Sequence, residues 1–178
     1  MKITMATIAA LCFIALAACK KDDTKPGSDN TFTVTVDSTK FTSSASDFLI
    51  YIDTLTGRQT PSGADNFAYD LTGPMGGGQL VEVVMNTTSG KLTTGAYTNI
   101  ADENNQVFWR ANPTDPAYYL AVPKYTTTVN VTRSDSAFLE GNFSGTLAYS
   151  TDTSKKVSVT GGQFKVNLKT AIIGRSRR

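Results

Sequence analysis

Hydrophobic and polar residues alternate along most of the chain after residue 30, with the two-residue period of a β-strand. In TFTVTVD, at residues 31–37, Phe32, Val34 and Val36 share one face and the threonines occupy the other. No helical spacing persists there for three turns, and the threonine, valine and aromatic content suits pleated strands. Further strands are predicted at residues 47–53, 67–72, 79–86, 106–111, 118–122, 126–133, 138–150 and 156–169.

About nine strands without an intervening helix predict an all-β domain, either an antiparallel β-sandwich or, alternatively, a closed β-barrel. A turn is predicted at residues 37–40, where Asp, Ser, Thr and Lys interrupt the pattern. The glycine-rich stretch TGPMGGG at residues 72–78 is predicted to form a long hairpin loop, because glycine tolerates positive φ.

The last predicted strand changes parity. Val157 and Val159 alternate in one register, whereas Phe164 and Val166 alternate in the other. One extra residue between them would return all four side chains to one face, so the sequence predicts a bulge or tight bend at Gly161-Gly162.

Residues 1–18 have a different pattern, with Met1-Lys2 followed by an uncharged run rich in alanine and leucine. This run is too short to span a bilayer comfortably and is typical of a secretory signal. Leu16-Ala17-Ala18-Cys19 resembles the lipobox of bacterial lipoproteins, in which cleavage precedes the cysteine and its thiol receives a diacylglyceryl group. The resemblance implies that Cys19 is lipidated and anchors the chain to a membrane.

The stretch after Cys19 predicts a tether. Residues 20–30 are polar and poor in apolar side chains, as in flexible linkers. Lys21-Asp22-Asp23 resembles the signal with which Bacteroidota carry lipoproteins to the outer face of the outer membrane, although a periplasmic position stays open. The predicted organisation is a signal peptide at 1–18, a lipidated tether at 19–30, one β domain at 31–173 and a basic tail at 174–178.

The domain itself carries a further resemblance. FTVTVDSTKFTSS at residues 32–44, LTTGAYT at 92–98, and EGNFSGTL with VSVTGGQFKVNL near the end are similar to elements of small Bacteroidota lipoproteins of unassigned function. These elements consist of core side chains and turn glycines, so the resemblance implies a fold and no site. Those proteins usually place a glycine where this chain has Ser38-Thr39, which leaves the type of the first turn open.

Composition excludes several classes of chemistry. The chain has two cysteines, Cys12 in the predicted signal and Cys19 at the predicted lipid, and no histidine. Disulfides, cysteine nucleophiles, Ser-His-Asp triads and histidine-based zinc or iron sites are therefore excluded from the folded part, and no cofactor is predicted. The formal net charge of +2 argues against a nucleic-acid partner.

Carboxylates offer the remaining route to hydrolysis. Glu82 shares a strand face with Leu80 and Val84, so it is the candidate acid, but nothing in the sequence brings a second carboxylate such as Asp70 to it. The loop ADENNQ at residues 101–106 clusters oxygen ligands of the kind that calcium prefers. It lacks the spacing of an EF-hand, and the calcium candidates are Asp102, Glu103 and Asn104.

Aromatic residues provide the leading candidate for ligand binding. VFWRANPTDPAYYL places Trp109 and Arg110 before a proline-bearing loop, and Tyr118 and Tyr119 after it. Flat aromatic faces stack on sugars, so these four residues are the predicted glycan platform, unless Trp109 belongs to the core.

Three tripeptides resemble the Bacteroidota O-glycosylation sequence, in which Asp precedes Ser or Thr and a small or apolar residue. They identify Ser38, Thr54 and Ser136 as candidate acceptors.

Together these features predict a non-enzymatic, lipid-anchored surface protein that binds a glycan or a protein, or makes a structural contact. The loops expected to bind are at residues 73–78 and 101–119. Two alternatives stay open, namely a carboxylate-dependent hydrolase and a protease-inhibitor-like barrel.

Overall fold

The structure is a computed structural model of the chain, and it describes residues 30–43, 49–55, 66–169 and 172–174. The predicted signal, Cys19 and nearly all of the predicted tether and basic tail lie outside these residues. Within the described ranges, no helix has both the length and the apolar character needed to cross a bilayer.

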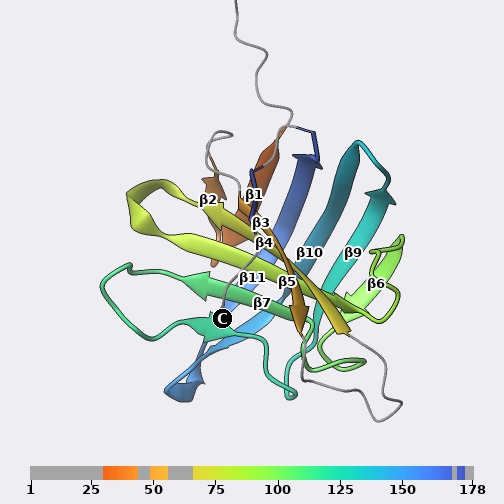
Figure 1. Cartoon of the computed structure of the whole chain (residues 1–178). Coiled ribbons are helices and arrows are strands. Elements are labelled where there is room, and N and C mark those ends of the chain that lie inside the picture. Colours follow the sequence, from red (N-terminus) through yellow and green to blue (C-terminus); the bar gives the residue numbers. More distant parts are fainter. Residues whose placement is uncertain (1–29, 44–48, 56–65, 170–171, 175–178) are drawn as a thin grey trace, which may run out of the picture.

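The described residues form an all-β fold, as predicted (Figure 1). Each predicted strand is present, and β2, β6 and β12 are short additions. One short 3-10 helix, Gly76–Gly78, lies in the hairpin loop. The strands are β1 (Thr31–Val36), β2 (Thr39–Thr42), β3 (Leu49–Leu55), β4 (Asn66–Pro74), β5 (Leu80–Thr87), β6 (Gly95–Thr98), β7 (Gln106–Arg110), β8 (Tyr119–Leu120), β9 (Thr127–Ser134), β10 (Phe138–Tyr149), β11 (Asp152–Asn167) and β12 (Ile172–Gly174).

All of these strands belong to one sheet, in the order β12-β3-β4-β5-β7-β8-β10-β11-β1-β2. Every pair is antiparallel except β12 with β3. The first part of β10 pairs with β9, which in turn carries β6 at its other edge, and the last part of β10 pairs with β8. The sheet therefore has a branch, with β6 at its outer edge.

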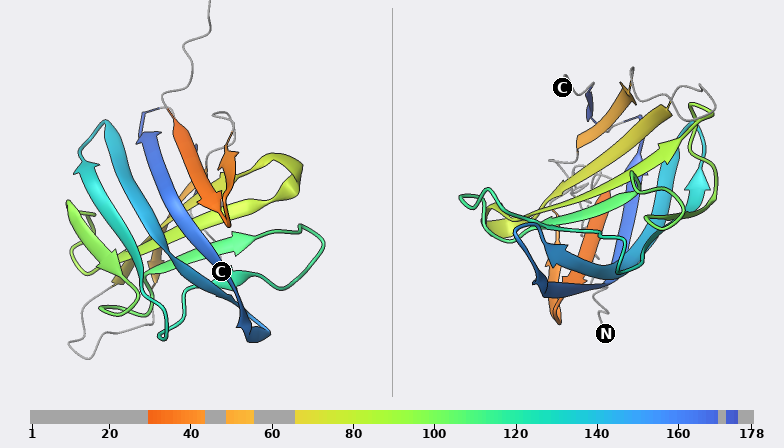
Figure 2. Two further views of the ribbon diagram at one scale, coloured as in Figure 1. Left: turned by 180° about the vertical axis from the view of Figure 1, so that it is seen from behind. Right: turned by 90° about the horizontal axis from the view of Figure 1, so that it is seen from below.

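The sheet is curled into a half-barrel, so that its two ends face each other. In Figure 1, β4, β5 and β7 lie in front of β1, β10 and β11, and Figure 2 shows the reverse order from behind. Contacts between strands that are not neighbours confirm this arrangement. A Cβ on Gly73 of β4 would lie 3.0 Å from the Phe32 ring of β1, and Phe41 of β2 packs on Trp109 of β7 with ring centroids 4.8 Å apart.

One hydrophobic core fills the space between the facing strands. Phe32, Phe143 and Leu71 are among its largest fully buried side chains, and the Phe32 and Phe143 rings lie 5.3 Å apart. The alternating strands supply this core because every second residue points inward. In β5, for example, Val81, Val83 and Met85 are buried, whereas Glu82 lies on the other face.

The predicted bulge in the last strand is confirmed. Thr33 of β1 pairs with Gln163 and Thr35 pairs with Thr160, so β11 contains one extra residue between these pairs. Gly161 has the left-handed φ of 56° that this insertion requires. A side chain at Gly162 would place its Cβ 2.6 Å from the backbone oxygen of Phe143, so this position needs glycine for a different reason.

The first hairpin has a tight turn. Val36 pairs with Thr39, which leaves Asp37 and Ser38 as a two-residue loop with φ values of 45° and 73°. Positive φ at both positions defines a type I′ turn, which settles the turn type that the sequence left open. The Asp37 carboxylate accepts a hydrogen bond from Ser158 N at 2.7 Å, which favours Asp at the first position. Ser38, in contrast, adopts a left-handed conformation that favours glycine.

Replacement of Ser38 by glycine is therefore expected to stabilise the protein. S38G removes the unfavourable left-handed conformation of a residue with a Cβ and should raise the free energy of unfolding by about 1 kcal/mol. Urea denaturation of both proteins measures the change. S38A keeps the Cβ and should give no gain, and a gain of equal size in S38A would contradict the explanation.

Candidate functional site

The predicted aromatic platform is not formed, because its residues lie on opposite faces of the sheet. Trp109 is only 3% exposed and packs in the core, and Tyr119 packs against the same core. Tyr118 instead contacts the Phe108 ring, at 5.6 Å between centroids. Arg110 is exposed at the end of β7. The platform is absent for a physical reason: Trp109 has the largest side chain in the chain, and its burial stabilises the core.

The loop between β7 and β8 is tied down near these residues. Tyr149 donates its hydroxyl hydrogen to Asp115 at 2.7 Å, and its ring lies 5.0 Å from that of Tyr119. The backbone N–H of Ala117 and this tyrosine hydroxyl hold the pKa of Asp115 below its ordinary value. Asp115 therefore acts here as an anchor for the loop.

The two loops expected to bind a ligand lie against each other. A Cβ on Gly78 would approach the Pro113 ring to 2.8 Å, and Gly77 and Gly78 both have positive φ. Met75, at the start of the same hairpin loop, is buried in the core. The predicted hairpin at residues 72–78 is thus confirmed.

The calcium candidates form a self-contained turn. Asp102 Oδ1 accepts hydrogen bonds from the backbone N and from Nδ2 of Asn104, both at 2.9 Å. Glu103 is exposed. No group of three or more Asp, Glu, His or Cys side chains in the described ranges is arranged to hold a metal. Asp102 and Asn104 thus form an Asx turn.

Strand register brings two carboxylates closer than the sequence indicated. Asp70 of β4 lies opposite Val84, and Glu82 of β5 lies opposite Thr72, so the two acids are diagonal neighbours on the face away from the core. Diagonal positions have Cα atoms about 7–8 Å apart. Asp70 also accepts a hydrogen bond from the Thr72 hydroxyl at 3.3 Å. Neither acid lines the pocket that is described below.

Two of the three candidate O-glycosylation sites are exposed. Ser38 lies in the type I′ turn and Ser136 in the turn between β9 and β10, whereas the side chain of Thr54 in β3 lies outside the described residues. Asp135, which precedes Ser136, has a structural role. The backbone N–H groups of Phe138 and Ala137, each 2.7 Å from Oδ1, and Arg133 lower the pKa of Asp135 to about 2.

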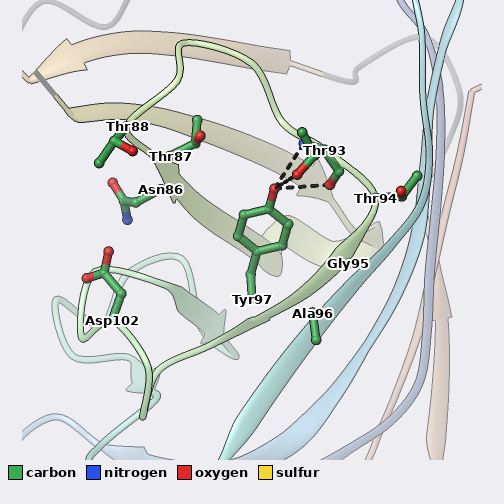
Figure 3. A pocket seen from close by; sticks show the side chains of 9 residues that line it. All are labelled: Asn86, Thr87, Thr88, Thr93, Thr94, Gly95, Ala96, Tyr97 and Asp102. Carbon is green, nitrogen blue, oxygen red and sulfur yellow. Dashed lines mark hydrogen bonds between the residues drawn. The ribbon is translucent and has the colours of Figure 1, made fainter.

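A polar pocket of about 420 Å³ opens between the end of β5 and the edge strand β6 (Figure 3). Its walls combine an amide, a carboxylate and a phenol ring with a border of hydroxyl groups. Figure 3 shows the Tyr97 ring between Asn86 and Asp102 on one side and Thr93 on the other. The groups that contribute polar atoms are Asn86, Thr87, Thr88, Thr93, Thr94, Tyr97 and Asp102.

Hydrogen bonds fix the loop between β5 and β6 that borders this pocket. Tyr69 lies in β4 and reaches the loop from that neighbouring strand, and burial raises the pKa of its hydroxyl group. Tyr97 both accepts a bond from Thr93 N and donates one to Thr93 O, each at 3.0 Å. The other bonds are Tyr69 Oη to Gly90 O at 2.8 Å, Thr87 Oγ1 to Lys91 O at 3.2 Å and Ser134 Oγ to Leu92 O at 2.7 Å.

Two other buried asparagines, Asn99 and Asn105, have hydrogen-bonding partners for their side chains. Asn99 donates to the backbone oxygens of Val122 and Tyr125, each at 3.0 Å, and accepts from Thr127 N at 2.8 Å. Asn105 accepts from Asn86 N at 2.8 Å and donates to Thr98 O at 3.2 Å. Such pairing is the rule for buried amides.

Asn86 breaks this rule. Its side chain is 7% exposed, and neither Nδ2 nor Oδ1 has a hydrogen-bonding partner among the described residues. An unsatisfied buried amide destabilises a protein by about 1–3 kcal/mol. Asn86 lines the pocket, and in Figure 3 its amide points toward Asp102. The pocket therefore contains a donor and an acceptor that have no partners within the described ranges.

Edge strand β6 adds backbone groups to the pocket. Antiparallel strands bond through alternate residues, and Thr98 O turns away from β9 to accept Asp102 N at 3.1 Å. Ala96, two residues earlier, presents its N–H and C=O in the same direction and lines the pocket. In the part of the chain that the structure describes, β6 pairs with β9 alone.

Of the residues that line the pocket, the sequence singles out Asp102, and only as a candidate calcium ligand. The sequence pattern places Asn86 at the end of a predicted strand, and Tyr97 only within the element LTTGAYT. The one signal at Asn86 is that an amide continues the outward face of β5 after Glu82 and Val84. The burial of Asn86 depends on the loop at residues 99–105, and no local sequence pattern indicates that this loop covers Asn86.

Comparisons with known proteins give no match: no protein-family model, no curated protein and no solved structure is similar to this chain.

The unsatisfied amide predicts an unusual effect on stability. N86L removes two buried polar atoms without partners and should raise the free energy of unfolding by about 1–3 kcal/mol. N99L is the matched control, because it removes an amide with three hydrogen bonds, and it should lower stability by about 2 kcal/mol or more. Thermal and urea denaturation measure both changes. A loss of stability in N86L comparable to that in N99L would show that Asn86 is a structural amide.

Proposed function

We propose that this chain is a non-enzymatic, lipid-anchored protein of the Bacteroidota outer membrane that binds a glycan in the pocket between β5 and β6. The observation that carries the proposal is the buried, unpartnered amide of Asn86 in a pocket bordered by hydroxyl groups. A bound ligand with matching hydrogen-bonding groups would offset the desolvation of this amide.

The chemistry of the pocket favours a saccharide. Each sugar hydroxyl both donates and accepts, and the pocket offers donors and acceptors of amide, carboxylate, hydroxyl and backbone types. Tyr97 adds a flat ring beside these polar groups, and sugar rings stack on such faces through their C–H groups. An apolar ligand would leave most of the polar lining of the pocket without partners.

The proposed location follows from the chain before β1. Lipidation at Cys19 would attach the protein to a membrane, and the tether up to Thr31 reaches at most about 35 Å when fully extended. Lys21-Asp22-Asp23 supports export to the cell surface. A domain held in this way would present its pocket to glycans outside the cell.

Glycan binding is tested directly with the soluble domain, residues 30–178, on a panel of neutral and acidic oligosaccharides. The wild-type domain should bind at least one neutral member, and N86L should weaken that binding about tenfold or more. Y118A is the control, because Tyr118 belongs to the platform that is not formed, and it should bind as the wild type does. Absence of binding to the whole panel, or equal binding by N86L, would end the proposal for this pocket.

Anchoring is tested in cells that produce the full chain. Mass spectrometry of the purified protein should find Cys19 as an acylated N-terminal residue, and C19A should release the protein from the membrane fraction. Labelling of intact cells should fall when Lys21-Asp22-Asp23 is deleted. An intact leader or an unmodified thiol at Cys19 would contradict lipidation, and unchanged labelling would contradict the export signal.

A further inference from the structure

We propose that the pocket selects neutral saccharides with two adjacent hydroxyl groups, which bridge Asn86 and Asp102, and that it rejects uronates and sulfated sugars. This inference rests on the proposed glycan-binding function and adds the class of glycan. It follows from the atoms that the pocket leaves open and from the charge of its lining.

Asp102 and Asn86 each have hydrogen-bonding atoms without partners among the described residues. Asp102 Oδ1 already accepts two bonds from Asn104, whereas no hydrogen bond or ion pair to Asp102 Oδ2 is formed within the described part of the chain. Asn86 contributes a free Nδ2 donor and a free Oδ1 acceptor. One sugar hydroxyl can donate to Asp102 Oδ2 while its neighbour accepts from Asn86 Nδ2, which satisfies both groups at once. Figure 3 shows these two side chains facing each other.

The edge of β6 adds backbone groups to the same pocket. Ala96 offers a backbone N–H and a C=O toward the same space, two residues before Thr98 in the strand. These groups can bond a third hydroxyl of the same ring. Asn86 and Ala96 each combine a donor with an acceptor, and Asp102 Oδ2 accepts. This set suits hydroxyl groups, which donate as well as accept, and not a carboxylate or sulfate, because these anions only accept.

The charge of the pocket lining is set by Asp102. Among the residues that the structure describes, Asp102 is the one carboxylate that lines the pocket, and no Lys or Arg lines it. The nearest basic residue along the bordering loop, Lys91, bonds through its backbone oxygen to Thr87 and Ser89 and does not line the pocket. A sugar carboxylate placed here would meet a like charge without compensation.

An opposite chemistry exists elsewhere on the surface and must be separated from the pocket. Lys124 and Lys156 each place their ammonium nitrogen 5.6 Å from the centre of the Tyr125 ring, and both lysines are exposed. Acidic polymers can bind such cations without entering the pocket. The test therefore includes a variant in which both lysines are replaced.

The experiment uses a matched pair of ligands: the tightest neutral oligosaccharide from the panel, and the same oligosaccharide after oxidation of its C6 hydroxyls to carboxylates. Calorimetry with K124S/K156S should show the neutral ligand binding about tenfold or more tightly than the uronate. D102N removes the charge, and its Oδ1 can still accept the bonds of the Asx turn. This variant should bring the ratio close to one, mainly by strengthening uronate binding.

The possible failures are distinct. Equal binding of the neutral and oxidised ligands, with both lost in N86L, would overturn the charge selection and leave glycan binding in place. A preference unchanged by D102N would also overturn it. Absence of binding by every glycan would end the proposed function, and the selection with it. A circular dichroism melt of D102N confirms that any change in the ratio occurs in a folded domain.

Discussion

The arrangement of the core depends on the one extra residue that β11 contains at Gly161. β11 pairs with β10 and β1 on its two sides, so the face that its side chains occupy determines what lies between the two ends of the curled sheet. Without the insertion, Phe164 and Val166 would point away from Val157 and Val159. Gly162, at the same bulge, lets Phe143 approach the backbone, where a Cβ would clash at 2.6 Å. The insertion and the close approach together give the sheet a continuous apolar face.

The pocket, unlike the core, contains a buried side chain whose polar atoms have no partner among the described residues. Core positions are chosen by the loss of apolar surface to the interior, and every strand contributes to them through simple alternation. Asn86 is buried on the other face of β5, under a loop held by Asn105, and its amide atoms obtain no partner there. Such a residue destabilises the folded state by itself. A ligand that bonds to both amide atoms would offset this cost.

This contrast between core and pocket explains how much of the structure could be predicted from the sequence. The strands from Gln106 to Asn167 and the bulge in β11 were predicted because alternation and parity are local properties. β6 was missed because its four residues, which begin with Gly95, carry too little alternation to identify a strand. Trp109 was ambiguous for a related reason: alternation places it on a face but cannot tell which face is covered. The meeting of Asn86 with Asp102 depends on register and on loop closure, which are tertiary properties.

The bordering loop bears on how the pocket would bind. Its backbone is held by Tyr69, Thr87, Tyr97 and Ser134, which lie in four strands of the sheet, β4, β5, β6 and β9. A ligand would therefore meet walls that are already ordered, and the loss of chain entropy on binding would be small. By contrast, the hydrogen-bonding groups of the pocket that have no partner within the described part of the chain belong to Asn86, Asp102 and the edge of β6. Rigid walls with a few open hydrogen-bonding positions favour recognition by the pattern of hydroxyl groups over adaptation to many shapes.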